Sequence, residues 1–412
     1  MKQQQSILGI NIRWWYLATG LLALFTVLRG IRYPSSWTYT HYLFNYDFGF
    51  VKRGFVGAVV GVFNTPALYT YESFFVFTVL ISLANIVLLA LVLRDFINSG
   101  QPALLGAALV FVSSMGLVYL AHTVGYFDHI GLLLTLIALR ITDFNKKLIY
   151  LCFAMLLALL IHEGNLIMFF PVMFMSLVLS SGLAKTIKPD TAALKKRFVL
   201  IGVFALAVLV TAQFMSQARH DGATIKAMMD RDIAEANYPI RKGAYGVMNS
   251  HTRYAVKQMI PMWQDPERYP KMAKSLAVTL PAALFFIYLT VIMLRRQSVH
   301  RYLIILAVLA ALSPLVLHAL AYDLERWNTL MVATSFLMLA AAFAADPESA
   351  KALPPQRVLP LALVLVAVQC VSTTKLMDGQ EVENFPFTAH REYISDFMSG
   401  KETFPWEPGK VW

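Results

Sequence analysis

The chain has 412 residues and a formal net charge of +11; 58% of its residues are hydrophobic and 14% are charged. Soluble globular domains carry about 25% charged residues, so this composition excludes a soluble fold and predicts an all-α, polytopic transmembrane helical bundle. The positive charge does not indicate a nucleic-acid-binding protein, because membrane proteins gather Lys and Arg in their cytoplasmic loops.

Eleven apolar runs have spanning or near-spanning length, since about 20 residues are needed to cross a hydrocarbon core about 30 Å thick. They cover residues 14–30, 73–94, 103–122, 126–141, 148–162, 165–181, 198–215, 276–294, 302–321, 327–345 and 358–373. The fourth and fifth runs are short and are bounded or interrupted by titratable residues. We therefore expect ten to twelve spans, and most simply eleven.

Lys and Arg are distributed unequally over the short loops. Sixteen lie in segments that are cytoplasmic if the N-terminus is inside, against five on the other side: Arg29, Arg32, Lys52, Arg53 and Arg326. This asymmetry predicts an N-in, C-out orientation. The predicted organisation is a membrane domain, residues 1–373, with a first outer loop at 31–72 and a long outer loop at 216–275. A tail, 374–412, is expected to pack on the same outer face.

The first outer loop contains a dense polar cluster within Asn45–Gly57. Asp47 precedes the adjacent cations Lys52 and Arg53, and residues 54–63 form an apolar, glycine-containing stretch that is expected to be a helix lying at the membrane interface. A carboxylate at that surface is suited to act as a general base, and the two cations are suited to hold a lipid phosphate. The alternative is that Asp47 caps the helix and the cations anchor it to anionic lipid.

Two further clusters border the short fourth and fifth runs. Asp128 and His129 lie at the start of the fourth run, where an ionisable pair is costly unless it is paired, hydrated or functional. We expect Asp128 to face a substrate, and a purely structural hydrogen-bond network is the alternative. His162 and Glu163 lie in a very short connection and are candidates for the same cavity, although a tight turn alone would also account for that segment.

The remaining candidates lie in later outer segments. Arg326 follows Asp323 by three residues, so it is suited either to bind phosphate or to pair with Asp323 on the same helical face. In the long loop, residues 223–236 are expected to be helical and residues 239–270 to be irregular and lid-like. Its basic and aromatic residues suit a sugar or pyrophosphate ligand, and Arg231 is a candidate to bind it.

These features resemble the GT-C superfamily of integral-membrane glycosyltransferases, which use polyprenyl-linked sugar donors on the non-cytoplasmic face. The resemblance depends on Asp47 in the first outer loop, the expected interfacial helix at 54–63, the many spans and the basic outer loops. It implies that Asp47 is the catalytic base and that Arg and Lys residues hold the donor phosphate. Asp128 is the second candidate for the base, and Lys52, Arg53 and Arg326 are the candidates for stabilising the departing phosphate.

The predicted function is that of an inverting glycosyltransferase in a bacterial inner membrane. It would transfer a sugar or glycan from a polyprenyl-(pyro)phosphate donor to a glycan or lipid acceptor at the periplasmic face, in cell-envelope polysaccharide or glycoconjugate synthesis. No cofactor is required. A divalent cation is an open but unsupported alternative, because the His and Asp spacing fits no familiar metal motif and the two cysteines, Cys152 and Cys370, lie in separate apolar runs.

Three alternatives stay open. The chain also resembles O-antigen or capsule-type polysaccharide polymerases, which place arginines in large periplasmic loops. A transporter or flippase of lipid-linked glycans and a scaffold for partners in envelope assembly are the other two. Polar groups that gather at one face favour an enzyme over a transporter, because a transport pathway would place charges at several depths.

Overall fold

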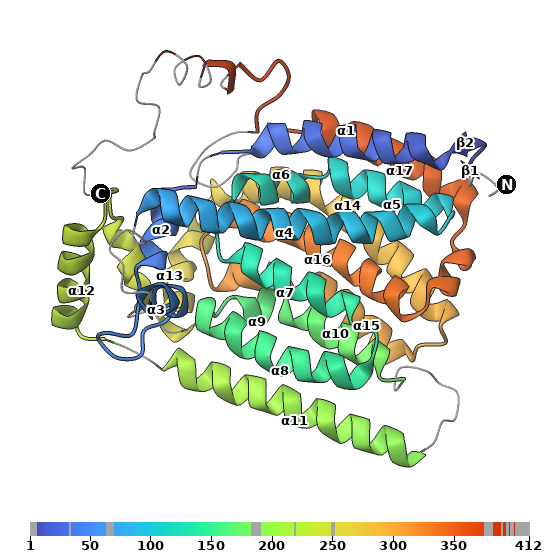
Figure 1. Ribbon diagram of the computed structural model, residues 1–412. Helices are drawn as coiled ribbons and strands as arrows, with labels where there is room; N and C mark the ends of the chain where they lie inside the picture. Colours follow the sequence, from blue (N-terminus) through green and yellow to red (C-terminus); the bar gives the residue numbers. More distant parts are fainter. Residues whose placement is uncertain are drawn as a thin grey trace.

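The computed structural model describes residues 6–32, 34–62, 70–182, 191–217, 220–248, 252–374, 382–388, 390–392, 395 and 399. Over this part the chain forms an elongated bundle of helices (Figure 1), which confirms the all-α prediction. The strands of the described part are β1 (Ser6–Ile7) and β2 (Ile10–Asn11), an antiparallel pair that precedes the first helix.

Each of the eleven predicted apolar runs is a helix or a pair of consecutive helices. These helices are α1 (Ile12–Gly30), α4 (Tyr71–Asn98), α5 (Pro102–Ser113), α6 (Met115–His122), α7 (Asp128–Arg140), α8 (Phe144–Ile161), α9 (Asn165–Met168), α10 (Phe170–Ser180), α11 (Thr191–Ser216), α14 (Arg268–Arg296), α15 (Arg301–Ala311), the 3₁₀ helix η3 (Ser313–Ala319), α16 (Leu324–Ala345) and α17 (Pro355–Val371). Hydropathy therefore predicted the helical segments correctly.

Fewer of these helices can cross a membrane by themselves. Within the described residues, five are long and apolar enough, namely α4, α8, α11, α14 and α16, and two pairs bent by 42° and 55°, α5 with α6 and α15 with η3, raise the total to seven. A helix such as α7, with 13 residues, is only about 20 Å long at about 1.5 Å per residue and falls short of the hydrocarbon thickness. The described residues thus contain five to seven candidate spans.

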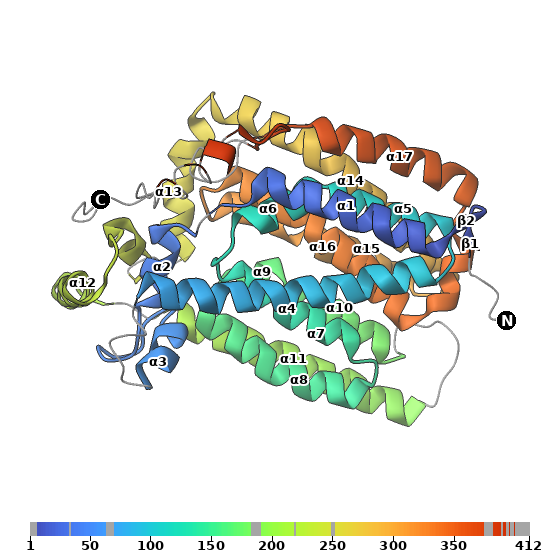
Figure 2. The same ribbon diagram turned by 45° about the horizontal axis from the view of Figure 1, so that its top comes forward.

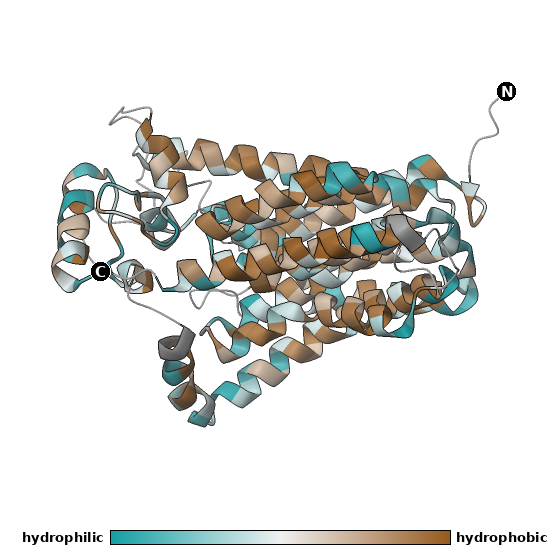
Figure 3. Cartoon of the chain, turned by 90° about the horizontal axis from the view of Figure 1, so that it is seen from below, coloured by the Kyte–Doolittle hydropathy of each residue, from teal (hydrophilic) through white to brown (hydrophobic). Residues whose placement is uncertain are grey.

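Apolar residues cover the middle of the bundle and hydrophilic residues gather toward its two ends (Figure 3). On the outer helices many large apolar side chains are exposed, among them Leu80 of α4 and Phe214 of α11. Helix α16 differs, because it lies at the centre of the bundle (Figure 2) and packs against α14, α10, α15 and α6. An apolar outer surface of this kind is stable in lipid and not in water.

The shorter helices lie between the predicted spans. They are α2 (Ser36–Tyr42), α3 (Phe55–Val62), α12 (Gly222–Glu235), the 3₁₀ helix η2 (Lys242–Met248), α13 (Thr252–Gln264) and the 3₁₀ helix η4 (Pro347–Ala352). Helix α3 confirms the helix expected at 54–63, of which Phe63 lies outside the described residues, and α12 confirms the one expected at 223–236. The prediction that 239–270 is irregular was wrong.

Two features explain that error. Apolar residues recur at helical spacing in α13, at Val256, Met259, Ile260 and Trp263, which is the pattern of an amphipathic helix. Pro270, at the end of that segment, lies in the first turn of α14, where a missing N–H costs no intrahelical hydrogen bond.

The described parts of the tail lie against the C-terminal end of α1. The backbone N–H of Glu383 donates to the carbonyl of Arg29 at 3.0 Å, and His390 Nε2 donates to the carbonyl of Leu28 at 2.6 Å. Phe387 contacts Phe25 edge to face, with ring centroids 5.9 Å apart. The rest of the predicted tail, including residues 375–381 and 400–412, lies outside the described residues.

Candidate functional site

The polar clusters that the sequence singled out lie at one end of the bundle, the end that carries α2, α3, α12 and α13 (Figures 1 and 2). The N-terminal hairpin lies at the opposite end. Segments that are far apart in the sequence therefore meet, and most of the candidate residues form ion pairs or hydrogen bonds with one another.

Asp47 lies in the connection between α2 and α3, and its side chain is 68% exposed. Its Oδ2 accepts a hydrogen bond from Nη1 of Arg231 at 2.8 Å. Arg231 projects from α12, where Nε and Nη2 donate to Asp232, while Nη1 also donates to Asn45. The Phe48 ring lies under its guanidinium, 5.2 Å away. Four interactions thus orient the guanidinium that holds Asp47.

A cavity of about 470 Å³ opens beside this carboxylate. Its lining comes from the Asp47 segment, from α3 and from α12, and comprises Asn45, Tyr46, Asp47, Ala58, Gly61, Val62, Arg231 and Glu235. The cavity is therefore bordered by two carboxylates, one guanidinium and the apolar face of a short helix. That combination can accept a polar group carried on an apolar chain.

Arg53 is held by partners on other elements. Its Nε and Nη2 donate to the two carboxylate oxygens of Glu163 at 3.1 and 2.7 Å, and its Nη1 donates to Nε2 of His41 at 3.2 Å. His41 therefore carries its proton on Nδ1, which donates to the carbonyl of Trp37 at 3.1 Å. Burial and the Arg53 charge lower the pKa of His41, which agrees with a neutral ring.

Glu163 is ionised in this arrangement. Burial raises the pKa of its carboxyl group, but the Arg53 guanidinium has the opposite effect and the pKa ends below the usual value. The Glu163 side chain is nevertheless 44% exposed, so solvent screens part of the attraction. His41 was not among the sequence candidates. Its position four residues after Trp37 on a helix, in an aromatic-rich segment, was the available signal.

Backbone conformation and close backbone contacts restrict the loop that bears Arg53. Arg53 has a φ of 63°, a left-handed conformation that costs about 1–3 kcal/mol for a residue with a side chain. Four residues later, a Cβ on Gly57 would lie 2.2 Å from the carbonyl oxygen of Phe44. Glycine is thus required for α3 to approach the end of α2 this closely. These two positions fix where the Arg53 guanidinium projects.

Asp128 and Arg326 form a second ion pair, deeper in the bundle. Nε and Nη2 of Arg326 donate to the two oxygens of Asp128 at 2.9 and 2.5 Å, and Nη1 donates to Asp323 at 3.2 Å. The Asp128 side chain is fully buried and that of Arg326 is 8% exposed. The rings of Tyr126 and Trp327 flank the guanidinium at 5.3 and 4.7 Å. The Asp323 pairing that the sequence offered as an alternative is thus present.

The other candidates are also enclosed. Lys52 is 7% exposed and His129 is 5% exposed, with its Nε2 3.4 Å from Thr123 Oγ1. Nδ1 of His162 accepts from the backbone N–H of Gly164 at 2.8 Å, which closes the short turn after α8. Within the described residues there is no group of three or more His, Cys, Asp or Glu side chains that could hold a metal ion.

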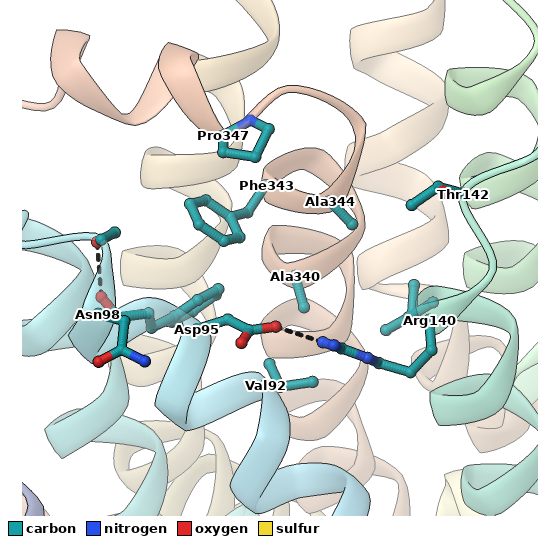
Figure 4. A pocket seen from close by; sticks show the side chains of 12 residues that line it. Val92, Asp95, Asn98, Arg140, Thr142, Ala340, Phe343, Ala344 and Pro347 are labelled. Atoms are coloured by element: carbon teal, nitrogen blue, oxygen red, sulfur yellow. Dashed lines mark hydrogen bonds and ion pairs between the residues drawn. The ribbon is translucent and has the colours of Figure 1, made fainter.

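A separate cavity of about 420 Å³ lies at the opposite end of the bundle (Figure 4). It is lined mostly by apolar side chains of α4, α7 and α16, and Asp95 in its wall pairs with Arg140 and with Arg94. None of the sequence candidates lines it. The end with α3 and α12 is therefore the better candidate for the functional site.

The fold and this site define a helical protein with candidate membrane spans and a polar cavity at one end. Comparison with protein-family models, with curated proteins and with solved structures finds no match.

Proposed function

We propose that the protein is a membrane glycosyltransferase that passes a sugar or glycan from a polyprenyl-(pyro)phosphate donor to an acceptor hydroxyl. The observation that carries the proposal is the Asp47 carboxylate. It is 68% exposed, borders a cavity of about 470 Å³, and is oriented by a guanidinium that is itself held by α12. A general base needs this combination of access and fixed geometry.

In the proposed reaction, Asp47 removes the proton from the acceptor hydroxyl as the oxygen attacks the anomeric carbon of the donor. The bond between that carbon and the phosphate oxygen breaks, and the phosphate leaves with the bonding electrons. The attack from the opposite side inverts the configuration. Asp47 finishes protonated and returns the proton to solvent through its exposed side. Asp128 is less suited to this role, because it is fully buried and both of its oxygens accept from Arg326.

We propose in addition a location in the bacterial inner membrane, an N-in orientation and a periplasmic active face. The supporting observations are the unequal charges of the short loops and the convergence of the candidate residues at one end of the bundle. Lipid-linked donors fit that face, since nucleotide sugars are absent from it. The helix α3 beside the cavity is short and apolar, as an interfacial helix would be.

Replacing Asp47 by Asn tests the base role. The amide keeps the size of the side chain but cannot accept the proton, so we expect product formation to fall by about 10²- to 10⁴-fold. The measurement compares lipid-linked glycans extracted from cells that express either form, with membrane insertion confirmed in both. Asp230→Asn is the matched control, because Asp230 is an exposed carboxylate on α12 that pairs with Lys226.

Wild-type product levels in an inserted Asp47→Asn protein would exclude the base role. The variants Arg53→Ala and Lys52→Ala then separate the remaining possibilities. Loss of product in these two variants would favour a polymerase-like reaction that depends on the cations. Wild-type levels in all three variants would refute an enzymatic function at this site.

A further inference from the structure

Arg268 is a buried cation that no carboxylate neutralises within the described residues. It is the first residue of α14, and only 5% of its surface is exposed. Its Nε and Nη2 have no hydrogen-bond acceptor within the described part of the chain. A buried charge without a partner is costly. The candidate arginines Arg53, Arg231 and Arg326, in contrast, form ion pairs with carboxylates.

Nε and Nη2, the two nitrogen atoms without an acceptor in the described part of the chain, can bind one ligand together. Nε–H and Nη2–H lie along one edge of the planar guanidinium, the edge that binds two oxygens of a phosphate or carboxylate at once. Two aromatic rings lie near the same group, since the ring centroids of Trp263 and Tyr322 are 5.1 Å and 5.9 Å from its central carbon. The Nε/Nη2 edge is thus the part of the guanidinium that can take a ligand.

Hydrogen bonds hold the Trp263 side chain and backbone in place beside Arg268. Nε1 of Trp263 donates to the carbonyl of His318 at 3.1 Å, and the hydroxyl of Tyr269 donates to the carbonyl of Trp263 at 2.5 Å. Glu325 exerts an electrostatic influence from α16, yet it forms no ion pair with Arg268. The helix N-terminus adds partial positive charge at the same place. The aromatic side chains and the positive charge together form a site that is suited to an anion.

The position of Arg268 in the bundle indicates which kind of anion it binds. Helix α14 is one of the candidate spans, so its first residue lies at headgroup depth, where phosphate esters of lipids are the abundant anions. Tyr322 is 64% exposed and lies in the connection before α16, so its side chain can move aside to admit a headgroup. We propose that Arg268, between Trp263 and Tyr322, is a binding site for the phosphate group of a lipid.

This site does not depend on the transfer reaction proposed above, and Asp47→Asn is expected to leave it intact. The test uses the full-length protein in nanodiscs of phosphatidylcholine, titrated either with phosphatidylglycerol or with inorganic pyrophosphate. We expect saturable binding of phosphatidylglycerol, weakened about 10- to 100-fold by Arg268→Gln. Arg268→Lys should also weaken it, because an ammonium lacks the two-pronged edge. Arg301→Gln is the control, since Arg301 also stacks on a tyrosine, at the other end of the bundle.

A second measurement keeps the test valid if the variants fail to fold. Phenylglyoxal reaches Arg268 of the wild-type protein through the same movement of Tyr322 that admits a headgroup, and mass spectrometry locates the modified arginines. Phosphatidylglycerol should protect Arg268 and leave Arg301 reactive. Protection by pyrophosphate alone would overturn the lipid assignment and identify a site for a soluble anion. Equal binding by wild-type and Arg268→Gln protein, or no protection of Arg268 by either probe, would overturn the site itself.

Discussion

At the scale of single residues, the sequence identified the charged candidates but not the distant residues with which they pair. Arg326 follows Asp323 by three residues, and helical spacing alone offered their contact as one of two alternatives. The partners Asp128 and Arg326 are 198 residues apart, and Arg53 and Glu163 are 110 apart. Nothing local in the chain connects them. Each ion could be singled out because it is costly near lipid, but its partner is determined only when the helices pack.

The Asp128–Arg326 pair gives a prediction about stability. Removing one member leaves an uncompensated buried charge, so Arg326→Gln should lower the free energy of unfolding by about 3–5 kcal/mol. The double variant Asp128→Asn/Arg326→Gln leaves no charge and should recover part of that loss. Thermal denaturation of the purified proteins in detergent measures both.

Arg140→Gln is the matched control for this prediction. Arg140 pairs with Asp95 where the two side chains are 38% and 30% exposed, and such pairs contribute about 1 kcal/mol or less. The account of Asp128 would be wrong if Arg326→Gln were no more harmful than this control, or if the double variant were less stable than Arg326→Gln alone.

At the scale of elements, α3 depends on close packing that its composition does not reveal. The sequence predicted its residues as a helix, and three glycines within Asn45–Gly57 indicated a special backbone. It did not show why each glycine is there. The structure gives two different reasons: Gly49 has a φ of 92°, which L side chains rarely adopt, whereas an added Cβ at Gly57 would meet the backbone carbonyls of Phe44 and Tyr42.

Gly57→Ala tests this packing, and two effects compete. In a free helix the change would be stabilising by about 1 kcal/mol. Here the new methyl group would lie 2.2 Å from the carbonyl oxygen of Phe44 and 2.7 Å from that of Tyr42, and overpacking of this kind costs about 1–3 kcal/mol. We expect a lower midpoint of thermal denaturation. Gly222→Ala, at the start of α12 with nothing within 4 Å, should be neutral or mildly stabilising, and an equal result for the two would contradict the close contact.

At the scale of the whole molecule, hydropathy predicted where helices form and could not predict where each one lies. In α16, 83% of the most apolar window is buried, against 22% in α4 and in α11. The central α16 is the least apolar of the three, so apolarity does not mark the buried helix, because side chains that face lipid are as apolar as those that face the protein core. The position of α16 at the centre depends on the packing of its neighbours, as does the meeting of distant loops at one end.

The orientation of the bundle gives a prediction that accessibility can decide. Starting from a Cys152→Ala/Cys370→Ala protein, we expect Asp230→Cys on α12 to react with an impermeant maleimide added to spheroplasts. Lys351→Cys on η4 should react only after lysis. The two side chains are 54% and 67% exposed and lie at opposite ends of the bundle, so local burial cannot produce the difference. The reverse pattern would place the Asp47 cavity in the cytoplasm, where nucleotide sugars are available, and would remove the reason for a lipid-linked donor. Labelling of both sites in intact spheroplasts would contradict a membrane-spanning bundle.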